Sequence, residues 1–65
     1  MNMMDAIEII EERDDATIQE YIDAFAYLIE SKVVWGLQGF YGRTARHLID
    51  CGAISEEGKV LSYHI

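Results

Sequence analysis

The residues best suited to chemistry lie between positions 43 and 51. His47 and Cys51 are four positions apart, so on a helix both side chains lie on one face and could contact the same metal ion. Two ligands form an incomplete site, and no CxxC, HExxH or second cluster completes it. Asp50 suggests a Cys–His–Asp nucleophile, but adjacent helix residues point in different directions and nothing resembles an oxyanion hole. We therefore expect no catalytic residue, no metal, no cofactor and no enzyme.

Three glycines precede this stretch at a spacing typical of loops that bind phosphate. Gly36, Gly39 and Gly42 are three positions apart. A phosphate loop needs a preceding strand and a lysine or helix start aimed at the anion, and neither is evident. Each glycine inside a helix costs about 1 kcal/mol relative to alanine. Close backbone packing between helices, or a surface shaped for a partner, would offset that cost, and we favour the packing.

Two arginines lie on neighbouring turns of the same segment. Arg43 and Arg46 could contact DNA, and residues 44–51 look like the recognition helix of a helix-turn-helix protein. Against DNA binding, the chain has a net charge of -7. Two arginines do not outweigh this negative charge, which repels phosphate. We expect Arg43 to pair with acidic residues of the first two helices, because a guanidinium suits bidentate pairing. Nucleic acid is therefore an unlikely partner.

Length and composition limit the architecture. A single domain of 65 residues buries only about 60% of its unfolded surface, so we expect a homo-oligomer. A hydrophobic content of 51% argues against disorder. Cys51 alone excludes an internal disulfide framework. Neither a basic signal segment nor a long apolar run is present, so we expect a cytoplasmic protein with no membrane partner.

The negative charge lies in the first half of the chain. Residues 1–32 carry nine acidic and two basic side chains, whereas residues 33–65 carry three of each. A solvated helix face is the commonest meaning of such a run, and a basic partner would be attracted to it. The acidic side chains predicted to contact that partner are Glu8, Glu12 and Asp23.

Apolar spacing predicts the first helix over residues 3–13. Met3, Ala6, Ile7 and Ile10 recur at intervals of three and four positions. They should therefore form one stripe against the core.

A second helix is predicted to run from Thr17 to about Ser31. Thr17 and Glu20 are spaced as a capping box, with Asp15 as a rival cap. Asp23 and Tyr27 should lie outside, and Tyr21 at the edge of the apolar face. The side chains expected to face the core are Ile18, Ile22, Phe25, Leu28 and Ile29.

The last third of the chain predicts a short helical turn at residues 33–37 and a helix over residues 41–51. A strand at Val33–Val34 is the less favoured alternative, because no second strand is available to pair with it. Gly52 should cap the last helix in the left-handed conformation, with Ile54 supplying a hydrophobic contact. The prediction is an all-α domain over residues 1–54. The tail, residues 55–65, could be a short helix, an edge strand or a frayed end.

The aromatic residues of this region are expected in a core or an interface. Trp35, Phe40 and Tyr41 lie among the glycines. An exposed cluster of such residues is a typical binding hot spot, so they join Arg43 and Arg46 as predicted partner contacts.

Residues 35–52 resemble a known signature. They match WxLQGxYGRTAxxLIxxG, found in a family of very small acidic proteins encoded mostly by bacteriophages, and the preceding helix matches more loosely. Phe40 departs from the family, which often has histidine there, and the residues after Ile54 are an extension that inherits nothing. The resemblance implies a phage origin and no mechanism.

Three functions are consistent with these features. The first is a non-enzymatic interaction protein whose acidic helices bind a basic surface of a host or viral protein in the host cytoplasm, as an inhibitor or a nucleic-acid mimic. The alternatives are a small helix-turn-helix-like DNA-binding regulator and a structural oligomer of the virion.

Overall fold

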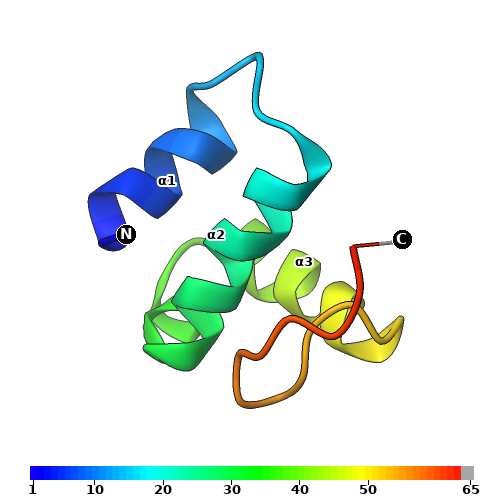
Figure 1. Cartoon of the computed structure of the whole chain (residues 1–65). Helices are drawn as coiled ribbons and strands as arrows, with labels where there is room; N and C mark the ends of the chain where they lie inside the picture. Colours follow the sequence, from blue (N-terminus) through cyan, green and yellow to red (C-terminus); the bar gives the residue numbers. More distant parts are fainter. Residues whose placement is uncertain (64–65) are drawn as a thin grey trace.

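The computed structural model describes residues 1–63, which form three α-helices and one 3-10 turn (Figure 1). The all-α prediction is confirmed, and the turn after the second helix is helical as expected. The elements are α1 (Met3–Glu11), α2 (Ile18–Glu30), η1 (Val33–Gly36) and α3 (Gly39–Asp50).

Helix α2 begins at the predicted capping box. The Glu20 amide donates to Thr17 Oγ1 at 3.1 Å, and the Thr17 amide donates to Glu20 Oε1 at 3.0 Å. The hydrogen bond from the Thr17 backbone is the main cause that lowers the pKa of Glu20. Two amides without helical partners are thereby satisfied, which explains why the helix starts at this point.

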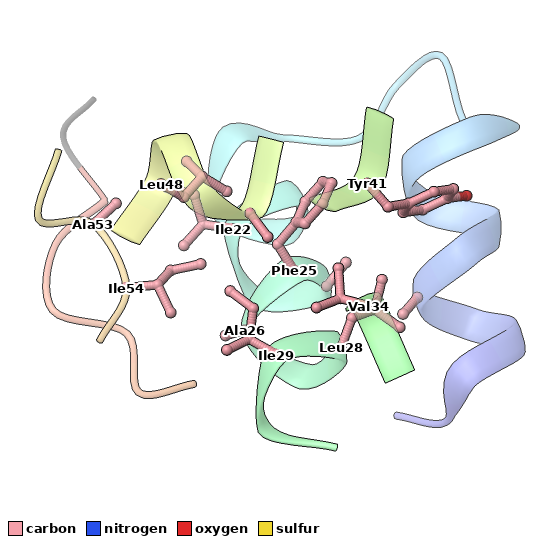
Figure 2. Close-up of a cluster of buried hydrophobic side chains, with 13 residues drawn as sticks. Ile22, Phe25, Ala26, Leu28, Ile29, Val34, Tyr41, Leu48, Ala53 and Ile54 are labelled. Atoms are coloured by element: carbon pink, nitrogen blue, oxygen red, sulfur yellow. The ribbon is translucent and has the colours of Figure 1, made fainter. Parts of the chain in front are cut away.

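The apolar face of α2 forms the centre of the core (Figure 2). Its fully buried residues are Ile22, Ala24, Phe25, Ala26, Leu28 and Ile29. The prediction is wrong for Ile18, which is 59% exposed. Ile18 is the first residue of the helix, so it lies beyond the part of α2 that other elements cover.

Helix α1 packs on one side of α2 and buries much less. Ala6 is its only fully buried residue, and Ile9 and Ile10 pack against the core while half-buried. Met3, predicted in the stripe, is exposed, because it is the first residue of the helix. The helix ends at Glu11, two residues before the predicted end.

Aromatic rings connect α2 to α3. The centroid of the Phe25 ring lies 5.1 Å from that of Tyr21 and 6.1 Å from that of Tyr41. Val34 of η1 and Leu48 of α3 extend the same core (Figure 2). These contacts hold η1 and α3 against α2.

Helix α3 ends as the sequence predicts. Gly52 has a φ of 86°, its amide donates to Ile49 O at 3.1 Å, and the Ala53 amide donates to Leu48 O at 3.0 Å. This is a Schellman motif, which glycine favours because it tolerates the left-handed conformation. Ile54, predicted as the hydrophobic contact, is fully buried.

After α3 the chain folds back beside α2 (Figure 1). Ile54 and Val60 form one isolated antiparallel bridge, and the Leu61 amide donates to Ala53 O at 2.7 Å. Of the conformations considered for residues 55–65, this is nearest to an edge strand. His64 and Ile65 lie outside the described residues.

Close backbone contact occurs at a glycine that the sequence did not single out. A Cβ on Gly58 would lie 2.5 Å from the backbone nitrogen of Glu30 at the end of α2. The predicted close packing is wrong for Gly36, Gly39 and Gly42, which have no backbone of another segment within 4 Å of a Cβ position. None of these three glycines therefore marks a close approach of two backbones.

Candidate interaction surfaces

An acidic surface lies on the outward side of α1 and on the loop that follows it. Asp5, Glu8 and Glu12 are exposed and are spaced by three and four positions, so they share one helix face. Asp14 is exposed in the loop. Within residues 1–63 none of these four carboxylates forms an ion pair. The acidic surface is defined by Asp5, Glu8, Glu12 and Asp14.

The third predicted acidic contact, Asp23, has a different environment. It is half-buried on α2, and its carboxylate accepts a hydrogen bond of 2.8 Å from the Tyr63 hydroxyl. That hydrogen bond is the main cause that raises the pKa of Tyr63. The structure thus brings Glu8 and Glu12 together, whereas Asp23 holds the C-terminal segment.

Other acidic residues pair within the chain. Arg13 lies 3.3 Å from both Asp15 and Glu20. Exposed pairs of this kind contribute only about 0.2–1 kcal/mol. Their effect is local, since they neutralise charge around the start of α2 and leave the outward face of α1 unbalanced.

Tyr41 is buried in its own chain. It is 2% exposed, and its hydroxyl donates to the carboxylate of Glu11 on α1. Figure 2 shows the Tyr41 ring with its hydroxyl directed toward α1. Burial, followed by this hydrogen bond, raises its pKa. Tyr41 therefore joins α3 to α1 and offers no ring surface to a partner.

Trp35 and Phe40, in contrast, remain accessible. Trp35 is 50% exposed and Phe40 is 36% exposed. The Phe40 ring lies 4.2 Å from that of Tyr41, centroid to centroid. Trp35 Cε3 would lie 3.9 Å from a Cβ on Gly42, so the indole rests beside the start of α3.

Arg43 lies beside the same segment, since its Nη1 atom would be 3.0 Å from a Cβ on Gly39. Its side chain is exposed and forms no ion pair with any residue between 1 and 63. The predicted pairing with the first two helices is therefore wrong, because the guanidinium folds along the start of its own helix. We call Trp35, Phe40 and Arg43 the aromatic surface.

Arg46 faces different partners. Its guanidinium lies 3.0 Å from Asp50 and 3.5 Å from Glu56, and the hydrogen bond to Asp50 is the main cause that raises its pKa. This side chain ties α3 to the C-terminal segment. It lies outside the aromatic surface.

Exposed methionines are the feature that sequence reasoning missed. Met1, Met3 and Met4 at the start of α1 are all exposed, Met4 at 77%. Met4 and Glu8 are four positions apart and lie on one face. The available signal was that Met4 does not belong to the apolar stripe, so its side chain has no place in the core.

The described part of the chain shows no further site. Cys51 is exposed, and its thiol contacts Leu48 O at 3.5 Å. No cluster of three metal-ligating side chains and no pocket occurs in residues 1–63. None of the helices found there has the length and apolar character needed to cross a membrane.

The chain belongs to a family described as a domain of unknown function, DUF7417, which matches residues 1–65. The match includes the C-terminal segment. No curated protein and no solved structure matched the chain.

Proposed function

We propose that this chain is a non-enzymatic interaction protein whose acidic surface binds a basic surface of another protein, either host or viral. The observation that carries the proposal is the row of unpaired carboxylates on the outward face of α1. Asp5 and Glu8 share that face and Glu12 follows at its C-terminal end. None of the three lies within ion-pair distance of a cation in residues 1–63; the nearby Arg13 pairs with Asp15 and Glu20 and interacts with Glu8 only at longer range. A protein rich in lysine or arginine would supply the missing cations.

The energetics of α1 support this assignment. Glu8 lies in α1 and Glu12 is the residue at its C-terminal cap. Like charges four positions apart are unfavourable for a helix by about 0.2–0.5 kcal/mol. A basic partner converts this repulsion into attraction and accelerates encounter. The face therefore costs the free chain stability and favours the complex.

The resemblance of residues 35–52 to small phage proteins supports a bacteriophage origin and a role in the host cytoplasm. In that setting the acidic surface would compete with DNA or RNA for a basic groove. The DNA-binding alternative requires Arg43 and Arg46 to be exposed, and both are. Arg46, however, pairs with two carboxylates, and the net charge of -7 repels phosphate. We therefore do not favour it.

Capture from a bacterial lysate tests the proposal. Tagged chain is incubated at low and high ionic strength, and the bound proteins are identified by mass spectrometry. We expect a basic protein that the chain retains at low salt and releases at high salt, since screening weakens attraction between exposed charges. The double variant Glu8→Lys/Glu12→Lys should lose it.

The single variant Glu8→Lys is compared with Glu57→Lys as its matched control. Glu57 is also exposed and forms no ion pair with any residue from 1 to 63, so the same change of charge is made in the C-terminal segment instead of α1. It should retain the partner. Capture that is insensitive to salt and to the double variant would contradict the proposal.

A further inference from the structure

We propose that the aromatic surface binds the start of α1 of a second copy of this chain, so that two copies form a symmetric dimer. Trp35 and Phe40 would receive Met4 of the other copy, and Arg43 would pair with its Glu8. This inference goes beyond the proposed function, because it assigns the aromatic surface and a different partner; of the acidic surface it uses only Glu8.

The aromatic surface lacks what the second copy supplies. Trp35 and Phe40 expose much of their rings, and Arg43 has no carboxylate partner within residues 1–63. This is unexpected in a chain with twelve acidic residues. An exposed arginine without an internal counter-ion, in the same short segment as two exposed aromatic residues, matches the composition of interface hot spots.

The start of α1 has the complementary chemistry. Met4 is 77% exposed, and Glu8 lies one turn further on the same outward face without an ion-pair partner. A thioether against an aromatic ring contributes about 0.3–1.5 kcal/mol. In the proposed dimer, Met4 and Glu8 of one copy therefore face the aromatic surface of the other copy.

Symmetry doubles the contact. In a two-fold dimer the same patch serves on both subunits, so each Arg43–Glu8 pair and each Met4–aromatic contact forms twice. A chain this small gains from such burial, because its own core supplies only about 3–5 kcal/mol of stability.

Net charge sets the salt dependence and distinguishes this inference from the proposed function. Two chains of net charge -7 repel each other, and the repulsion is screened over about 8 Å at physiological ionic strength. Dimerisation should therefore strengthen as salt rises from low to physiological concentration. Binding of a basic protein to the acidic surface should weaken over the same range.

Sedimentation velocity on the full chain tests the dimer. At about 0.15 M salt we expect a concentration-dependent monomer–dimer equilibrium. Trp35→Ala, Arg43→Glu and Glu8→Arg should each weaken it by about tenfold or more, equivalent to about 1.4 kcal/mol. Leu61→Ala, which removes an exposed apolar side chain of the C-terminal segment, should leave it unchanged.

Mixing two of these variants gives the sharpest result. Arg43→Glu alone brings two carboxylates together at each contact, and Glu8→Arg alone brings two guanidinium groups together, so neither variant should self-associate. In a heterodimer of the two variants both contacts join opposite charges, since one is the native Arg43–Glu8 pair and the other is the same pair exchanged. Association of the mixture should therefore return well above that of either variant alone. Circular dichroism confirms that each variant is folded. A wild-type chain that stays monomeric at every concentration, or a mixture that does not associate, would overturn the proposal.

Discussion

Helices α1 and α2 look alike in sequence but differ in how much they bury. Both begin with a side-chain cap, at Asn2 and Thr17 respectively, and both carry regularly spaced apolar residues. Helix α2 buries six side chains fully, whereas α1 buries only Ala6. The difference arises from position, because α2 lies between α1 and the returning C-terminal segment (Figure 1).

This contrast indicates that α2 stabilises the fold, whereas α1 carries the exposed charged face. Helix α2 contributes to every layer of the core, so its side chains determine whether the chain folds. Helix α1 covers one side of α2, and Tyr41 attaches it through Glu11. Its outward face is therefore free to carry like charges that a central helix would not accommodate.

The largest expected effect comes from truncating the centre of α2. Phe25→Ala removes a fully buried ring that packs beside Tyr21 and Tyr41. Such a change costs about 3–5 kcal/mol, comparable to the whole stability of a domain of this size, so the variant should be unfolded in thermal and urea denaturation. Ile10→Ala in α1 should cost less, since that side chain is already half exposed.

Ile18→Ala is the control within α2. Ile18 is largely exposed, so its free energy of unfolding should stay within about 0.5 kcal/mol of wild type. A folded Phe25→Ala variant, or an unfolded Ile18→Ala variant, would contradict the conclusion that the buried face of α2 stabilises the fold.

A smaller effect is expected where the C-terminal segment meets α2. Gly58→Ala places a Cβ 2.5 Å from the Glu30 nitrogen at a φ of 95°. Backbone must move to accommodate it, at a cost of about 1–3 kcal/mol. Urea denaturation should show the loss. Gly36→Ala, with no atom within 4 Å of the new Cβ, should be neutral or slightly stabilising, and equal losses in both variants would refute the close contact.

The smallest effect is expected at the attachment of α1. Tyr41→Phe removes the hydrogen bond to Glu11 and should cost about 1 kcal/mol. Hydrogen exchange should accelerate in α1 while α2 keeps its protection. Tyr63→Phe breaks the bond to Asp23 instead, so its effect should be confined to the C-terminal segment.

The hydrogen-bonded pair of Tyr41 and Glu11 also predicts how the stability of the chain depends on alkaline pH. The pKa of Tyr41 is raised in the folded chain, so the unfolded chain loses this proton first. Stability is therefore fully present below the ordinary tyrosine pKa and falls as pH rises toward the folded-state value. Tyr41→Phe should show a shallower alkaline loss, and identical pH profiles for the two proteins would exclude this role of Tyr41.

Local features were predictable from sequence at particular positions. The Thr17–Glu20 capping box and the Gly52 cap both depend on residues within a few positions of each other, and both occur as expected. Ile22, Phe25 and Leu28 face the core because helical spacing alone places them on one side. The predictions failed at Ile18 and Met3, where the spacing is correct but no other element covers the side chain.

The sequence predicted some features of the candidate surfaces and missed those that depend on contacts between distant residues. The excess of acidic residues in the first half is evident from sequence, and so is the shared face of Glu8 and Glu12. The hydrogen bond of Asp23 to Tyr63 and the unpaired state of Arg43 depend on residues far apart in the chain, so no local pattern reports them.

By itself, the sequence determined the helices, the caps at Thr17 and Gly52 and the sign of the charge on α1, because each follows from interactions between near neighbours along the chain. Only the tertiary structure decided that α2 is central and α1 peripheral, that Gly58 rather than the earlier glycines touches backbone, and that Arg43 forms no ion pair with a carboxylate of residues 1–63. These outcomes depend on which side chains remain exposed once the helices pack. Exposure is set by contacts between segments that are distant in the sequence, so it depends on the whole fold.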